Sequence, residues 1–195
     1  MTPVQSVLRW ARTGASVPAR LLHPFRRWQT RRRLVGRAPP RSIVFVCHGN
    51  ICRSPYAAAA FSRAVPPMFR ASLRIDSAGF VAPGRPAPLN AVQVAARRGL
   101  DLAAHRSTLI GLGGRIGSDL VVVMEPMQAH AVQTLFGRDG HDIVVLGDLD
   151  PEPIATRAIA DPVEQPEAAF EASYTRIDRC VAELGRVLFP GVAGR

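Results

Sequence analysis

Residues 42–64 of this chain, SIVFVCHGNICRSPYAAAAFSRA, contain the pattern that decides the fold. Residues 43–46, Ile-Val-Phe-Val, form a short apolar run with β-branched side chains at three of its four positions, which is typical of a strand buried on both faces. The alanine-rich stretch after it predicts a helix from about Arg53 to Ala64. The loop that starts at Cys47 therefore lies where a buried strand turns into a helix.

The same strand-then-helix order recurs along the chain, which predicts a parallel sheet flanked by helices. The chain has 195 residues, of which 47% are hydrophobic, and this is enough for one core. Further strands are expected at 73–76, 119–124 and 142–146, and further helices at 89–98, 126–136 and 167–188. On the last helix, a spacing near 3.6 residues predicts a core-facing side made by Phe170, Ile177, Val181 and Leu184.

The basic residues divide the chain into two parts. All 25 of them are arginine, so mechanisms that need a lysine, such as Schiff-base chemistry, are excluded. Residues 1–41 hold 10 arginines and no acidic residue, whereas residues 42–195 hold 15 arginines and 15 acidic residues, so the net charge of +10 belongs to the first part. We expect a flexible basic extension over residues 1–41, in which Pro18 and Pro24 interrupt any long helix, and one domain over residues 42–195.

The extension contains both tryptophans, Trp10 and Trp28, among its arginines. Such a segment is compatible with contact to an anionic membrane, contact to nucleic acid, or a targeting role. Because it is attached to a neutral domain, tethering is favoured over a charged binding groove, and no specific nucleic acid is predicted. Only three cysteines occur, and no apolar stretch approaches the roughly 18 residues of a membrane span. The sequence therefore predicts a cytoplasmic protein, soluble or peripheral to a membrane.

The loop after the first strand has the composition of an anion site. Its residues are Cys47, His48, Gly49, Asn50, Ile51, Cys52, Arg53 and Ser54. Backbone amides in a glycine-containing turn and the start of a helix attract an anion, and Arg53 can hold two phosphate oxygens at once. The same field favours the thiolate of Cys47, and Ser54 can donate a hydrogen bond to it. We expect Cys47 and Arg53 to be catalytic and the other six residues to bind substrate.

This Cys-x5-Arg-Ser loop closely resembles the signature of the low-molecular-weight protein tyrosine phosphatases. The resemblance covers roughly Arg41 to Phe189 and extends through residues 76–79, 99–101, 105–107, 119–124 and 161–162. It implies a flavodoxin-like three-layer fold with a four-stranded parallel sheet, as a single domain. It also implies hydrolysis of protein phosphotyrosine through a cysteinyl-phosphate intermediate, without a metal or other cofactor. By analogy, a bacterial tyrosine kinase of exopolysaccharide assembly is a possible partner.

The reaction also needs a group that protonates the leaving oxygen and then activates water. Spacing alone cannot choose among Asp148, Asp150, Glu152 and Asp161. The resemblance selects Asp161, because the family places its general acid in an Asp-Pro pair just before the last helix. It also implies that Asn50 and His105 shape the loop through hydrogen bonds.

The residues of this loop also allow other interpretations. A zinc site at Cys47, His48 and Cys52 is disfavoured, because no second ligand pair follows and Arg53 would repel a cation. The family resemblance leaves open a phosphoarginine phosphatase, whose members carry Thr where Ile51 stands, an arsenate reductase, or a phosphate-binding scaffold without turnover. In the family, the cysteine that matches Cys52 can form a disulfide with the nucleophile. Structural roles are expected for four further residues: Cys180 in the core, and His23, His130 and His141 at the surface or as caps.

Overall fold

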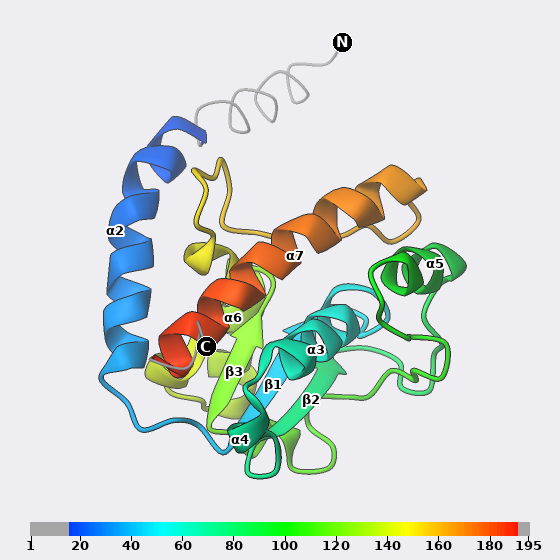
Figure 1. The fold of residues 1–195 in the computed structure, drawn as a ribbon, viewed down its shortest axis with the longest axis horizontal. Helices are drawn as coiled ribbons and strands as arrows, with labels where there is room; N and C mark the ends of the chain where they lie inside the picture. Colours follow the sequence, from blue (N-terminus) through cyan, green and yellow to red (C-terminus); the bar gives the residue numbers. More distant parts are fainter. Residues whose placement is uncertain (1–15, 191–195) are drawn as a thin grey trace.

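The computed structural model describes residues 16–190, and its centre is a parallel sheet of four strands (Figure 1). The order across the sheet is β2-β1-β3-β4. The strands are β1 (Ser42–Cys47), β2 (Arg74–Gly79), β3 (Leu120–Val123) and β4 (Ile143–Val145). All four strand predictions are confirmed, although the second strand runs further than expected, through Gly79.

Helices cover both faces of the sheet, as the sequence predicted. They are α3 (Arg53–Ala64), the short α4 (Pro67–Arg70), α5 (Leu89–Arg97), α6 (Pro126–Phe136) and α7 (Glu167–Leu188). The single-turn 3-10 segments are η1 (Arg115–Gly117), η2 (Gly140–Asp142) and η3 (Leu146–Leu149). Helices α3, α5 and α7 contribute side chains to one core cluster, and α6 contributes to the other. The result is the three-layer, flavodoxin-like arrangement that the family resemblance implied.

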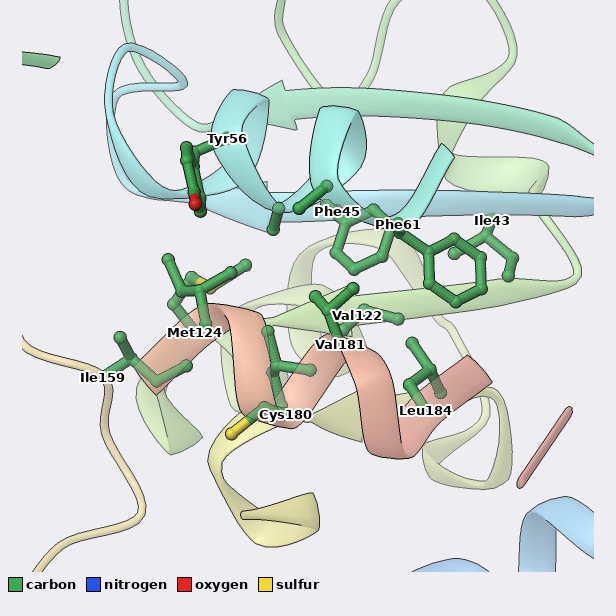
Figure 2. Close-up of a cluster of buried hydrophobic side chains, with 14 of the residues drawn as sticks. Ile43, Phe45, Tyr56, Phe61, Val122, Met124, Ile159, Cys180, Val181 and Leu184 are labelled. Atoms are coloured by element: carbon green, nitrogen blue, oxygen red, sulfur yellow. The ribbon is translucent and has the colours of Figure 1, made fainter. Parts of the chain in front are cut away.

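The two clusters follow from the alternation of side chains along the strands. Phe45 and Val122 face α3 and α7, where Figure 2 shows them beside Val181 and Leu184. Val44 and Val121 point to the opposite face, toward α6. The strands therefore carry apolar side chains on both faces, which explains their unbroken apolar runs. The residues predicted for the inner side of α7 (Phe170, Ile177, Val181 and Leu184) are buried, and so is Cys180.

The basic extension differs from the expectation over its described part. Residues Ser16–Val35 form one helix, α2, with Pro24 inside it, so the prediction that proline interrupts a long helix here was wrong. An interior proline costs a helix about 3 kcal/mol. Contacts with the domain offset that cost, because α2 lies against α7 and η3 (Figure 1). The part of the extension that contains Trp10 lies outside the described residues.

Helix α2 is held by polar contacts as well as by burial of Leu34. His23, expected at the surface or as a cap, is buried, and its Nε2 lies 2.9 Å from the carbonyl oxygen of Asp150. Glu183 on α7 is 1% exposed and forms ion pairs with Arg27 and Arg31 of α2 at 2.6 and 3.0 Å. The charge excess of the extension is thus partly met by an acidic group of the domain. His130 and His141 are exposed, as predicted.

Within residues 16–190, the structure contains no helix with the length and hydrophobicity of a transmembrane span.

Candidate active site

The loop between β1 and α3 is fixed by the end of the neighbouring strand. Cys47, the last residue of β1, lies in register with Gly79 of β2. A Cβ atom on Gly79 would lie 2.8 Å from both the amide nitrogen of Asn50 and the carbonyl oxygen of His48. Only glycine therefore lets the strand end approach the loop this closely. The amide of Phe80 then donates a 2.9 Å hydrogen bond to the carbonyl of His48.

The Cys47 thiol is buried at the base of this loop and has two hydrogen-bond donors. The amide nitrogen of Asn50 lies 3.2 Å from its Sγ, and the hydroxyl of Ser54 lies 3.1 Å from it. The first residues of α3 follow directly, so the positive end of a helix faces the same region. These two donors and the start of α3 are placed to stabilise negative charge that develops on the sulfur during a reaction.

Asn50 connects the loop to its surroundings. It is fully buried, and its φ of 51° lies in the left-handed region, which Asn tolerates better than most residues. Its side-chain amide donates 2.9 Å hydrogen bonds to the hydroxyls of Ser54 and Ser77, and its Oδ1 accepts one of 2.8 Å from the amide of Thr108. Asn50 therefore orients Ser54, and through it the hydroxyl group that faces the Cys47 sulfur.

A histidine supports the same turn from outside. Nε2 of His105 lies 2.6 Å from the carbonyl oxygen of Asn50. Burial lowers the pKa of His105 and outweighs the hydrogen bond to Asn50, which acts in the opposite direction. A neutral imidazole with its proton on Nε2 fits this contact, because only an N–H can donate to the carbonyl. Asn50 and His105 thus both form hydrogen bonds that hold this loop.

Arg53 is buried, with 1% of its surface exposed, and it forms ion pairs with two carboxylates. Its Nη1 donates to Oε1 of Glu125 at 2.5 Å and to the carbonyl of Ile159 at 2.9 Å, and its Nη2 donates to the carboxylate of Asp161. Its Nε–H is buried and has no acceptor among the described residues. The guanidinium is therefore held rigidly, and it keeps one N–H without a protein partner.

The four candidate acids lie in different surroundings. Asp161 is the one that contacts the loop, through Arg53, and its side chain is 35% exposed. Asp150 is fully buried between Arg176 and Arg179, at 2.9 and 2.6 Å. Asp148 forms an ion pair with Arg157, and Glu152 forms one with Arg179. Of the four, only Asp161 combines contact with Arg53 and access to solvent.

The other predicted loop residues divide into exposed and buried ones. His48 is exposed and Gly49 half-buried, whereas Ile51 and Cys52 are buried. Burial raises the pKa of Cys52 to about 12, and the nearby Asp161 and Cys47 act in the same direction. The Cys52 sulfur is therefore a neutral thiol near pH 7. Behind the loop, the hydroxyl of Tyr174 donates a 3.2 Å hydrogen bond to the carbonyl of Cys52.

Two charged residues that lie near the loop were not predicted from the sequence. Glu125 lies two residues after the end of β3 and contacts Arg53, and its position close to the carboxyl end of a buried strand was the available signal. Arg85 is exposed, and its Nη1 lies 3.6 Å from where a Cβ of Gly49 would be. The loop that carries Arg85 is tied to Ser107, which exchanges hydrogen bonds with the Arg85 backbone at 2.8 and 2.9 Å. No local pattern distinguishes Arg85 from the other arginines.

The Cys-x5-Arg loop lies at the carboxyl end of β1 in a parallel sheet, which is the arrangement that the sequence resemblance implies for a phosphatase, an enzyme that hydrolyses phosphate monoesters. The comparison with family models is consistent with this class: the model "Low molecular weight phosphotyrosine protein phosphatase" matches residues 42–188. The chain belongs to this family and is a hydrolase of the phosphatase type.

Related proteins cover most of the domain. EpsP of Ralstonia nicotianae is 32% identical over 142 residues, which are 72% of this chain and 91% of that protein. The low molecular weight protein-tyrosine-phosphatase Wzb of Salmonella typhi is 32% identical over 147 residues, which are 75% and 93% of the two chains.

Solved structures resemble the fold to a similar extent. Vibrio vulnificus Wzb in complex with benzylphosphonate has a TM-score of 0.65 and 27% identity, covering 75% of this chain and 98% of that one. The YwlE arginine phosphatase from Geobacillus stearothermophilus has a TM-score of 0.65 and 27% identity, covering 75% and 92%. The fold alone thus does not separate tyrosine from arginine phosphatases.

Proposed function

We propose that this protein hydrolyses protein phosphotyrosine through a cysteinyl-phosphate intermediate on Cys47. The observation that carries the proposal is the meeting of a hydrogen-bonded Cys47 thiol with Arg53 and Asp161 at one loop. The free Nε–H of Arg53 and the loop amides supply donors for the oxygens of a bound phosphate.

In the first step, the Cys47 sulfur attacks phosphorus and the bond from phosphorus to the phenolic oxygen breaks. Asp161, in its protonated form, gives its proton to that oxygen, so tyrosine leaves as a neutral phenol. Asp161 forms an ion pair with Arg53 in this phosphate-free structure. It exchanges that partner for the leaving oxygen when the phosphate oxygens occupy Arg53.

In the second step, the Asp161 carboxylate takes a proton from water as the water oxygen attacks phosphorus. The bond from sulfur to phosphorus breaks, inorganic phosphate forms, and the sulfur leaves as a thiolate. The Ser54 hydroxyl, 3.1 Å from Sγ, stabilises that thiolate, and Asn50 keeps the hydroxyl oriented. Each step as proposed uses only groups of this chain, the substrate and water.

The proposed substrate is an aromatic phosphoester rather than phosphoarginine. Ile51 is 6% exposed and lies beside Gly49 in the loop, so it offers a branched apolar wall to the ring of a phosphotyrosine. A relative with the same fold binds benzylphosphonate, which is a benzyl ring carrying a phosphonate group. The runner-up is phosphoarginine, because an arginine phosphatase is equally similar in fold.

The wider setting is also proposed. The partner is a phosphotyrosine protein, such as a bacterial tyrosine kinase, since related chains are named protein-tyrosine-phosphatases. We place the enzyme in the cytoplasm, with residues 42–195 as the catalytic domain and residues 1–41 bringing it to an anionic membrane.

The test is turnover of p-nitrophenyl phosphate, a phosphotyrosine peptide and a phosphoarginine peptide by purified protein. We expect the phosphotyrosine peptide to have the higher kcat/KM of the two peptides, and Ile51→Thr to move the ratio toward phosphoarginine. Cys47→Ala is expected to be inactive on all three substrates. Absence of turnover by the unmodified protein between pH 5 and 8 contradicts an enzymatic role, and a preference for phosphoarginine contradicts the proposed substrate.

A further inference from the structure

Helix α2 has a second face that the domain does not cover. Its inner face is buried against the domain through His23, Thr30 and Leu34. Four large apolar side chains of α2 lie three, four or seven positions apart in the sequence. This spacing places them together on a single side of the helix, away from the inner face. They are Leu21, Phe25, Trp28 and Val35, with exposed fractions of 76%, 58%, 53% and 60%. We call these four residues the outer stripe.

The outer stripe is an organised surface. The rings of Phe25 and Trp28 lie 5.9 Å apart, and the guanidinium of Arg32 lies 5.3 Å from the centre of the Trp28 ring. Single exposed apolar residues are ordinary on protein surfaces, but a row of them on one helix indicates a contact surface.

The charge around the outer stripe has one sign. Within residues 16–190, no carboxylate forms an ion pair with the exposed Arg20 or with Arg32, which contacts Trp28. Arg27 and Arg31 share the single carboxylate of Glu183 with Arg186, so this group only partly offsets their charge. Residues 1–41 contain no acidic residue. The surface that complements the outer stripe must therefore be apolar and negatively charged at once.

That requirement distinguishes between possible occupants. A second copy of α2 would bring like-charged arginines together, and residues 1–15 add two more arginines and no acid. Nucleic acid would meet the charge but leave the aliphatic side chains of Leu21 and Val35 without apolar partners. An anionic bilayer offers phosphate groups at its surface and acyl chains just below, and tryptophan is enriched at that boundary.

We propose that the outer stripe lies in the interface of an anionic membrane, with α2 parallel to the surface and its inner face still docked on the domain. A helix of 20 residues presents about 30 Å of length to the bilayer. The inference deepens the membrane contact proposed above by naming the face that makes it, and it does not depend on the catalytic assignment. It makes α2 an adaptor between a phosphatase domain and a lipid surface.

The chain offers a direct probe, because Trp10 and Trp28 are its two tryptophans. In Trp10→Phe protein, the fluorescence reports on Trp28 alone. Adding vesicles rich in phosphatidylglycerol is expected to shift the emission of Trp28 to the blue and to protect it from acrylamide. Pure phosphatidylcholine vesicles, or high salt, are expected to reduce both effects strongly.

Matched variants distinguish vesicle binding through the outer stripe from nonspecific hydrophobic binding. In the Trp10→Phe background, the double variant Leu21→Gln/Phe25→Gln is expected to weaken vesicle partitioning about tenfold or more, because two apolar side chains that insert into the bilayer are lost. The control is Met127→Gln/Leu135→Gln, whose side chains on α6 are 81% and 71% exposed, and it is expected to bind as before. Turnover of p-nitrophenyl phosphate is measured for every variant and is expected to stay unchanged.

Three outcomes overturn the inference. The first is vesicle binding while Trp28 stays open to acrylamide, which assigns binding to another part of the chain. The second is that the double variant and its control lose vesicle binding equally, or that neither of them loses it. The third is concentration-dependent protection of Trp28 without lipid, which indicates a second copy of the chain. Lack of turnover would contradict the catalytic proposal and leave the vesicle result standing.

Discussion

Replacing two aspartates that each precede a proline, Asp161 and Asp150, distinguishes a residue needed for catalysis from one needed for stability. Asp161 contacts Arg53 at the loop and is 35% exposed, whereas Asp150 is fully buried between Arg176 and Arg179. Replacing each with asparagine removes one charge and preserves shape. We expect the first replacement to slow the reaction and the second to destabilise the fold.

The magnitudes follow from these surroundings. A general acid contributes typically about 10²- to 10⁴-fold, so Asp161→Asn should raise the barrier for a phosphotyrosine peptide by about 3–5 kcal/mol. Its effect on the free energy of unfolding should stay below about 1 kcal/mol, because Arg53 keeps Glu125 as a partner. Breaking a buried ion pair costs about 3–5 kcal/mol, and Asp150→Asn should lie near the lower end because Arg179 is partly exposed.

The assay combines urea unfolding with kcat/KM for a phosphotyrosine peptide and for p-nitrophenyl phosphate, whose leaving group needs less protonation. Asp161→Asn should lose more rate on the peptide than on p-nitrophenyl phosphate, with near-normal stability. Asp150→Asn should unfold at lower urea but keep its kcat/KM where folded. If Asp150→Asn instead lost the larger rate at undiminished stability, the assignment of the acid would be reversed.

Four further predictions concern the surroundings of the site. Burial disfavours the charge of Asp150, but hydrogen bonds from Arg179 and the Glu152 amide outweigh it and lower the pKa of this carboxyl. The stability that the carboxylate supplies is therefore present above about pH 4, its unfolded pKa, and is lost at more acid pH. In urea titrations, stability should fall more steeply with acid in wild type than in Asp150→Asn. Asn50→Gly should be more stable than Asn50→Ala by about 1 kcal/mol in thermal unfolding, because glycine tolerates the φ of 51°; equal stabilities would contradict this. His23→Ala should cost about 2 kcal/mol by leaving a buried carbonyl without a donor, and a neutral effect would mean that α2 is not docked in solution. If Cys52 protects the nucleophile by a disulfide, Cys52→Ser should recover less activity than wild type after peroxide and thiol treatment, and equal recovery counts against protection.

The elements of the domain were predictable because their signals are local. Buried parallel strands show as unbroken apolar runs, and α7 shows a clear 3.6-residue period, so both were found to within a few residues. Helix α2 was not predicted, since Pro24 argues against a helix and the compensating contacts come from far away. The partners of His23 and Arg27 lie 127 and 156 residues along the chain.

The candidate site divides in the same way. The loop from Cys47 to Ser54 is contiguous, so its chemistry was visible in the sequence. The choice of Asp161 over Asp150 needed the family resemblance, because both are Asp-Pro pairs in one acidic stretch. Glu125 and Arg85 reach the loop only through the folding of the sheet and of the loop after β2. A residue brought in by tertiary structure leaves little local signal.

The most direct test of the central claim is detection of the phosphoryl group on sulfur. Asp161→Asn protein is mixed with p-nitrophenyl phosphate, quenched rapidly, digested and analysed by mass spectrometry. The good leaving group lets the first step proceed, while loss of the base slows hydrolysis of the intermediate. We expect one phosphoryl group on the peptide that contains Cys47, and none in the matched Cys47→Ala variant. Phosphorylation elsewhere, or undiminished turnover by Cys47→Ala, would contradict the proposed mechanism.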